Sequence, residues 1–207
     1  MEDAQTIIRV HDDLYASVPL EDLVRREIVP GAEIGGRYRI ERLLGAGGMG
    51  RVWLAEDLLE RRKVGFKEMQ ISPGSTPVQA EMSVLLFRRE FFAMKKLQHP
   101  GTVKVFDCGI LGSGNRYITM EVVGGEDLSE RLKQRPLSSD DVYRILAELA
   151  QILAFVHARL FVHCDIKAAN VRLLESGSVK LMDFGVMHQL GTPSSGWVQG
   201  TPTYMAP

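Results

Sequence analysis

The chain has 207 residues, which is enough for one large domain or two small lobes. Its hydrophobic content of 45% and charged content of 25% are typical of globular proteins. The net charge of −1 gives no support for a nucleic-acid partner, and no stretch of about 18 uncharged apolar residues could span a membrane. The two cysteines lack metal-ligand spacing and the first residues lack a secretory-signal pattern, so we expect a cytoplasmic protein.

Residues 1–36 form an acidic extension with eight acidic side chains and three basic ones. Because the whole chain has a net charge of −1, the residues after this extension carry a net positive charge, which suits a domain that binds a polyanion. A short helix is expected at residues 20–29, because Pro30 and Gly31 would end it. Two interpretations of this extension stay open: a loosely ordered tail, or a docking or regulatory segment.

A β-rich first lobe is expected at about residues 37–123. Tyr38, Ile40 and Leu43 are separated by charged residues in the alternating manner of a strand. Further strands are expected at residues 52–55, 64–67, 103–106 and 117–123. A helix is expected at residues 78–97, where His99, Pro100 and Gly101 would end it.

A helical second lobe is expected at about residues 124–207, after the hinge-like pair Gly124 and Gly125. Ser138 and Asp141 make a start that resembles a capping box, which predicts a helix at residues 138–158. Its apolar positions follow a 3.6-residue period: Val142, Ile145, Leu146, Leu149, Ile152, Leu153 and Val156. Short strands are expected at residues 171–174 and 179–181, and a loop from His188 onward. The fold class is therefore α+β with two lobes.

A glycine-rich run at residues 45–50 is a candidate phosphate-binding turn. Glycine triplets also occur in dinucleotide-binding folds, but there a helix follows the glycines. Here the strand-like residues 52–55 follow, which favours a hairpin whose backbone N–H groups can approach phosphates closely. The plain alternative is a glycine turn without a ligand.

Lys67 is expected on a strand between apolar neighbours, where a buried ammonium needs an anionic partner. Glu90 on the following helix is the preferred partner, and Glu81 is a second candidate. With such a partner, Lys67 could contact nucleotide phosphates. Taken by itself, Lys67 could also be an edge lysine that points into solvent.

Four polar residues within a short span carry the remaining chemistry. Asp165 is the candidate proton acceptor, and Lys167 could steady a transferred phosphate. Asn170 and Asp183 offer the oxygen ligands that magnesium prefers. The alternative is that all four are solvated loop residues, whereas His163 is expected to pack or to form hydrogen bonds rather than to catalyse.

Taken in order, these motifs resemble the protein kinase superfamily, and in particular the bacterial serine/threonine kinases of eukaryotic type. The resemblance covers residues 37–207 and implies a two-lobed kinase fold, ATP and Mg²⁺ as cofactors, and transfer of a phosphoryl group to protein serine or threonine. By this resemblance, the residues that cover the nucleotide are Leu44, Gly45, Ala46, Gly47, Gly48, Met49, Gly50 and Val52. The residues around the base, ribose and α- and β-phosphates are Met120, Glu121, Val123, Asp127 and Lys67, with Glu90 paired to Lys67.

The same resemblance makes Asp165 the proton acceptor, Lys167 a mark of serine/threonine specificity, and Asn170 and Asp183 the magnesium ligands. Three positions depart from the family pattern: Cys164 replaces an arginine, Gly65 an alanine and Arg172 a leucine.

Residues 200–207 resemble the end of an activation segment, so we expect an incomplete helical lobe. Two alternatives stay open: a truncated kinase-like protein that binds nucleotide or a partner without turnover, and a small-molecule kinase such as an aminoglycoside phosphotransferase.

Overall fold

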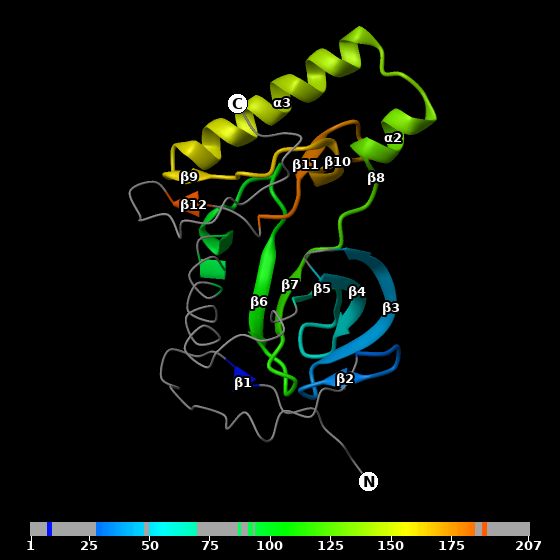
Figure 1. Ribbon diagram of the computed structural model, residues 1–207, viewed down its shortest axis with the longest axis vertical. Coiled ribbons are helices and arrows are strands. Elements are labelled where there is room, and N and C mark those ends of the chain that lie inside the picture. Colours follow the sequence, from blue (N-terminus) through cyan, green and yellow to red (C-terminus); the bar gives the residue numbers. More distant parts are fainter. Residues whose placement is uncertain are drawn as a thin grey trace. The chain divides into compact units, whose positions relative to one another are not determined.

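The structure is a computed structural model that describes residues 8–9, 28–47, 50–69, 87, 91–92, 94–184 and 188–189. The chain divides into two compact units, Met1–Phe92 with Val105–Val122 and Ala93–Lys104 with Val123–Pro207. The first unit contains a seven-stranded sheet, and the second contains a long helix with short strands (Figure 1). A β-rich part followed by a helical part agrees with the predicted α+β class, while the predicted domain boundaries at residues 36 and 123 stay predictions.

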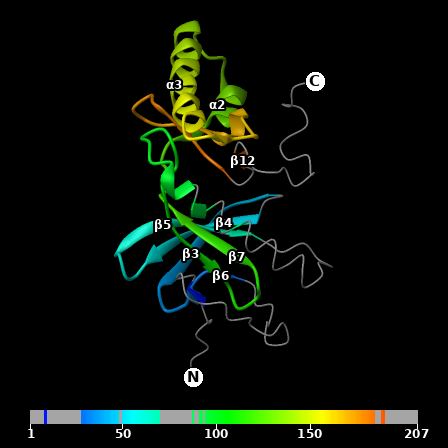
Figure 2. The same cartoon turned by 90° about the vertical axis from the view of Figure 1, so that its left-hand side faces the viewer.

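The sheet of the first unit is antiparallel throughout. Figure 2 shows this sheet from a second side. Its strands are β1 (Ile8–Arg9), β2 (Glu33–Ile34), β3 (Tyr38–Gly47), β4 (Gly50–Asp57), β5 (Arg62–Met69), β6 (Val105–Ile110) and β7 (Arg116–Met120). Their order is β1-β6-β7-β5-β4-β3-β2, so both edge strands come from the expected N-terminal extension. Strand β5 lies in the interior of the sheet, between β4 and β7.

Two expected strands have different bounds in the structure. Strand β6 begins at Val105 instead of residue 103, because Val103 belongs to the second unit and donates its N–H to the Leu181 carbonyl of that same unit at 3.1 Å. It then continues to Ile110 through register pairs with β7. Strand β7 ends at Met120 instead of residue 123.

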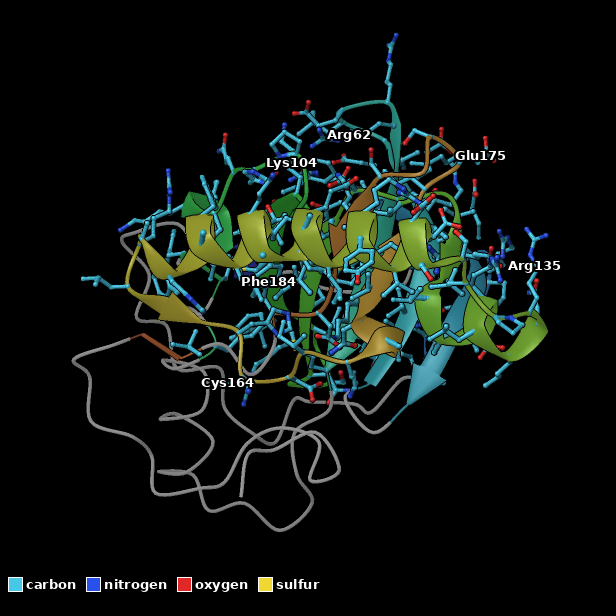
Figure 3. The ribbon with its side chains drawn as sticks, turned by 90° about the horizontal axis from the view of Figure 1, so that it is seen from above. Arg62, Lys104, Arg135, Cys164, Glu175 and Phe184 are labelled. Atoms are coloured by element: carbon cyan, nitrogen blue, oxygen red, sulfur yellow. The ribbon has the colours of Figure 1, made fainter. Side chains whose placement is uncertain are left out.

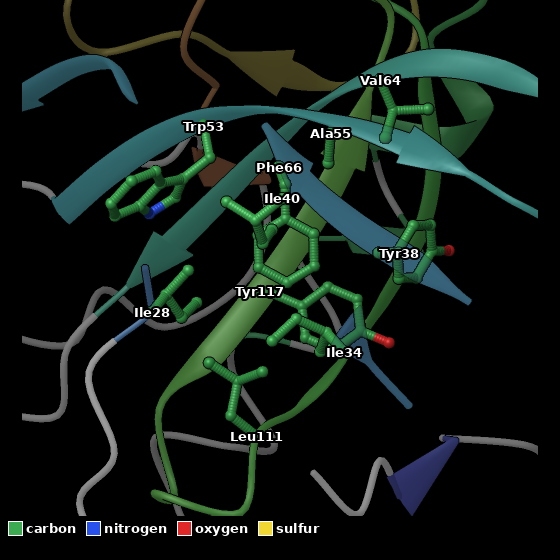
Figure 4. Packing of buried hydrophobic residues seen from close by; sticks show 10 residues of the cluster. All are labelled: Ile28, Ile34, Tyr38, Ile40, Trp53, Ala55, Val64, Phe66, Leu111 and Tyr117. Atoms are coloured by element: carbon green, nitrogen blue, oxygen red, sulfur yellow. The ribbon is translucent and has the colours of Figure 1, made fainter. Parts of the chain in front are cut away.

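The core of the first unit is built around three aromatic rings (Figure 4). The ring centroids of Phe66 and Tyr117 lie 4.7 Å apart and nearly parallel, and Tyr38 contacts both rings at 5.7 and 5.8 Å. Ile28 and Ile34 are buried in the same cluster, so part of the expected extension packs into the core. Residues 20–27 of the expected helix lie outside the described residues, and Ile28 and Val29 are not helical.

The expected helix at residues 78–97 is described only in part. Within the described residues, Phe87, Phe91, Phe92 and Met94–Lys96 are helical. Phe87, Phe91 and Met94 are buried.

The second unit is dominated by helix α3 (Ser139–His157), preceded by helix α2 (Leu128–Gln134). The Ser138 hydroxyl accepts the Asp141 N–H at 3.1 Å, which confirms the predicted N-cap. Four of the expected apolar residues are buried: Ile145, Leu149, Ile152 and Val156. Val142 and Leu146 are exposed at 38% and 57%, so the predicted apolar face was too wide.

The second unit also contains five short strands among its described residues. They are β8 (Glu126–Asp127), β9 (Phe161–Val162), β10 (Val171–Leu173), β11 (Val179–Leu181) and β12 (His188–Gln189), with a 3₁₀ turn η2 (Ala168–Asn170). Strands β11, β10 and β8 form one sheet, and β12 pairs with β9. Glu148 of α3 accepts the Val179 N–H at 2.8 Å and so ties β11 to the helix. Among the described helices, none has both the length and the apolar composition to cross a bilayer.

Candidate functional site

The glycine-rich turn joins β3 to β4, with Gly47 and Gly50 as register partners. Gly50 has φ of +121°, and a Cβ atom there would lie 2.0 Å from the Glu68 carbonyl oxygen, so only glycine fits. Leu44, Gly45 and Ala46 are exposed on the approach to the turn, and Val52 is half-buried after it. Gly48 and Met49 lie outside the described residues.

Lys67 lies on the interior strand β5, opposite Val52 of β4 and Ile118 of β7. It is 9% exposed, which excludes the alternative of an edge lysine that points into solvent. Its strand is thus placed directly beside the strand that leaves the glycine turn. Glu90, its expected partner, lies outside the described residues.

The residues expected around the base and ribose belong to both units. In the first unit, Met120 ends β7 opposite Gly65 and is half-buried, as is Glu121. In the second unit, Val123 is half-buried and Asp127 lies in β8. Arg172 of β10 is the register partner of Asp127 and donates from Nη1 to its Oδ1 at 2.7 Å.

Asp165 lies in the loop between β9 and η2 and is only 3% exposed. Its Oδ2 receives two donors, Lys167 Nζ at 2.8 Å and Asn170 Nδ2 at 2.9 Å. The Asn170 amide also donates to the Asp165 carbonyl at 2.8 Å, which closes the loop on itself. Sequence reasoning expected these three residues to act together, and the structure brings them together around one carboxylate.

His163 is a neutral side chain that forms hydrogen bonds to the Asp165 loop and to the segment after β11. The Asp165 N–H donates to its Nδ1 at 3.3 Å, so Nε2 carries the proton and donates to the Met182 carbonyl at 3.0 Å. Burial lowers the pKa of His163, which favours the same neutral state. Its ring also packs on Phe184 with 4.7 Å between centroids. His163 therefore packs and forms hydrogen bonds, as predicted.

Asp183 follows β11, and the segment that holds it is joined to the Asp165 loop. The Met182 N–H donates to the Asn170 carbonyl at 2.8 Å, so the two candidate metal ligands lie on segments in direct contact. Asp183 has φ of +53° and Cys164 has φ of +63°, a left-handed conformation that side chains other than glycine rarely adopt. Figure 3 labels Cys164 and Phe184 on these two segments. Such strain often accompanies functional sites.

The donor set suits a hard cation. An amide oxygen of Asn170 and a carboxylate of Asp183 are ligands that magnesium accepts, with phosphate oxygens and water to complete its shell. Among the described residues, no group of three or more His, Cys, Asp or Glu side chains could hold a metal by itself. Residues 200–207, the expected end of an activation segment, lie outside the described residues.

The sequence is similar over most of its length to a known protein family. The protein kinase domain family matches residues 38–207. Serine/threonine-protein kinase PknA of Mycobacterium tuberculosis is 36% identical over 185 residues, with 86% of this chain and 42% of the relative covered. Serine/threonine-protein kinase pkn3 of Myxococcus xanthus is 34% identical (86% and 34% covered). Serine/threonine-protein kinase PrkC of Bacillus subtilis is 32% identical (86% and 27% covered).

The chain thus spans less than half the length of these relatives. The match nevertheless runs through all the motifs described above, from β3 to the end of the chain. The chain belongs to the protein kinase family.

Proposed function

We propose that this chain transfers the terminal phosphoryl group of ATP to serine or threonine hydroxyls of protein substrates, with Mg²⁺ bound to the nucleotide. The observation that carries this proposal is the Asp165 carboxylate, which is buried and held by Lys167 and Asn170. The choice of protein acceptors follows the names of the three relatives, which are serine/threonine-protein kinases. An ATP-dependent enzyme with two free thiols fits the cytoplasm, which we propose as its compartment.

The residues of the second unit would handle the acceptor and the metal. Asp165 would accept the hydrogen bond of the attacking hydroxyl and orient it, because Lys167 and Asn170 fix the plane of its carboxylate. Lys167 would also balance charge on the transferred phosphate. Asn170 and Asp183 would hold Mg²⁺, which when bound neutralises charge on the phosphates.

The residues of the first unit would bind the phosphates and the base. The glycine turn would bring backbone N–H groups close to the phosphates, and Lys67 would pair with the α- and β-phosphates. Glu90 is proposed as the carboxylate that orients Lys67. Leu44, Val52, Met120 and Glu121, together with Val123 and Asp127, are proposed as base and ribose contacts.

The test is transfer of label from γ-labelled ATP with Mg²⁺ to the chain itself, to a generic basic protein and to an aminoglycoside. Asp165→Asn should lower the rate by about 10²–10⁴-fold, because the oriented proton acceptor is lost. Asp140→Asn makes the same chemical change at an exposed position of α3 and should leave the rate unchanged. Absence of transfer from the folded wild-type chain would contradict the proposal, and transfer to the aminoglycoside alone would contradict protein substrates.

A further inference from the structure

Glu68, which directly follows Lys67, is a buried carboxylate that joins three parts of the sheet. It is 1% exposed and accepts Arg51 Nε at 3.1 Å and Asn115 Nδ2 at 2.8 Å. Arg51 belongs to β4, and Asn115 lies in the turn between β6 and β7. Sequence reasoning missed this cluster, because these residues are 17 and 47 positions from Glu68.

The cluster lies where the chain leaves the glycine turn. Arg51 follows Gly50 and is the register partner of Glu68, just as Val52 is the partner of Lys67. Successive side chains of a strand point to opposite faces, so Lys67 and Glu68 serve opposite faces of the sheet. The Glu68 carbonyl also lies against Gly50, where a Cβ would approach to 2.0 Å. The side chain of Glu68 therefore contacts Arg51 and its backbone contacts Gly50, the two residues with which β4 begins after the glycine turn.

Stability alone is a weak reason to place a carboxylate at this position. The attraction within a buried ion pair only about offsets the hydration that the two charges lose on burial. Apolar residues of similar size in the same place often give an equally stable protein. An ion pair with defined geometry does, however, fix the separation of two strands. Arg51 and Glu68 thus fix the glycine turn relative to the strand that carries Lys67.

We propose that the cluster of Arg51, Glu68 and Asn115 positions the glycine turn against Lys67 and so determines affinity for the phosphates of the nucleotide. This inference rests on the proposed function, since it assumes that the turn and Lys67 bind ATP. The members are positioning residues, because they act through the turn and through Lys67. Binding of the nucleoside part should depend little on them.

The test is calorimetric titration of the wild-type chain and its variants with Mg-ATP, ADP and adenosine. Arg51→Met keeps the apolar stem of the side chain, and Glu68→Gln removes the charge while keeping the shape. Each variant should weaken ATP binding about tenfold and adenosine binding less than about twofold. The double variant should lose about as much affinity as either single one, because each single variant already removes the Arg51–Glu68 ion pair.

The matched control is Arg39→Met, which breaks the Arg39–Glu33 ion pair of 2.9 Å between β2 and β3 of the same sheet. It should leave the affinity for all three ligands unchanged. Equal losses for ATP and adenosine, or no loss for ATP, would overturn the inference. If Glu68→Gln fails to fold, Arg51→Met carries the test, because Arg51 is 22% exposed and tolerates replacement more readily. A folded wild-type chain that binds no ATP would instead refute the proposed function.

Discussion

Arg172 and Asp127 form an ion pair of 2.7 Å between neighbouring strands of the second unit. Arg172 also donates from Nε to the Gly124 carbonyl at 3.3 Å. The proposed site assigns Asp127 to the ribose. Arg172 replaces a leucine that, by the kinase resemblance, would lie below the base. The Asp127 carboxylate therefore already accepts a hydrogen bond from the Arg172 guanidinium, which makes it a weaker acceptor for a ribose hydroxyl.

We expect Arg172→Leu to strengthen ATP binding, because it releases Asp127 and offers an apolar surface to the base. The pair is partly exposed and is worth less than about 1 kcal/mol, so the gain should be at most about fivefold. The gain should be smaller for 2′-deoxyATP, which lacks one hydroxyl for Asp127. Calorimetric titration with both nucleotides measures the difference.

Asp127→Ala in the Arg172→Leu background is the control for this prediction. It should remove the preference for ATP over 2′-deoxyATP while leaving the apolar contact intact. Weaker ATP binding by Arg172→Leu would show that Arg172 itself contacts the nucleotide, and the assignment of Asp127 to the ribose would then be wrong.

Local patterns predicted helix α3 well. The cap at Ser138 and the period of α3 are set by residues within a few positions of one another, and the structure confirms them. The order of Lys67, Asp165 and Asp183 along the chain predicted the family, which the comparisons show. The exposure of Leu146 was not predictable, because the width of a buried face depends on which elements pack against the helix.

Pairings across the sheet could not be predicted from the sequence. Glu68 meets Arg51 and Asn115, and Arg37 meets Asp57 and Asp107, at separations of 17 to 70 residues. A charge pattern along one strand says nothing about which distant strand lies beside it. Such contacts follow from strand order and register, which the sequence motifs do not contain.

Gly65 and Gly109 both lie in strands of the first unit, and alanine should affect them differently. A Cβ at Gly65 would lie 3.2 Å from Met120 Cγ, the movable side chain of a methionine. A Cβ at Gly109 would lie 2.6 Å from the ring of Tyr117, which is buried in the aromatic core. We expect Gly65→Ala to change the free energy of unfolding by less than about 1 kcal/mol and Gly109→Ala to lower it by about 1–3 kcal/mol.

Urea denaturation followed by circular dichroism measures both changes. Each variant is the control for the other, because both add a methyl group to a strand of the same sheet. Equal losses would mean that Met120 cannot move aside. No loss at Gly109 would mean that the Tyr117 ring shifts freely, contrary to its stacked contact with Phe66.

Ser138 caps α3 and offers a clean test of local stability. Its hydroxyl accepts the Asp141 N–H and donates to the Asp141 carboxylate at 2.8 Å. Ser138→Ala should lower the free energy of unfolding by about 1 kcal/mol, because an N–H of the first turn loses its acceptor. Nucleotide affinity should stay unchanged in calorimetry, and a loss of affinity without a loss of stability would contradict a purely structural role.

The Arg37–Asp57 pair gives a prediction about pH. Arg37 donates to both oxygens of the buried Asp57 carboxylate, at 2.9 and 2.8 Å. Burial alone would raise the pKa of Asp57, but the hydrogen bonds from Arg37 and from the Glu60 and Leu59 N–H groups outweigh it and lower the pKa. Asp57→Asn should therefore lower the free energy of unfolding by about 3 kcal/mol near neutral pH.

This stabilisation has a defined pH window. The folded-state pKa lies below the ordinary value of 3.8, so the contribution of Asp57 is complete above that value and is lost as the pH falls below it. The difference in unfolding free energy between the wild-type chain and Asp57→Asn should stay constant from about pH 7 to 5 and shrink below about pH 4. The control is Glu175→Gln, at an exposed turn, which should change the free energy of unfolding at pH 7 by less than about 0.5 kcal/mol. A difference that grows on acidification would mean that the pKa of Asp57 is raised in the folded protein, and that burial outweighs the guanidinium.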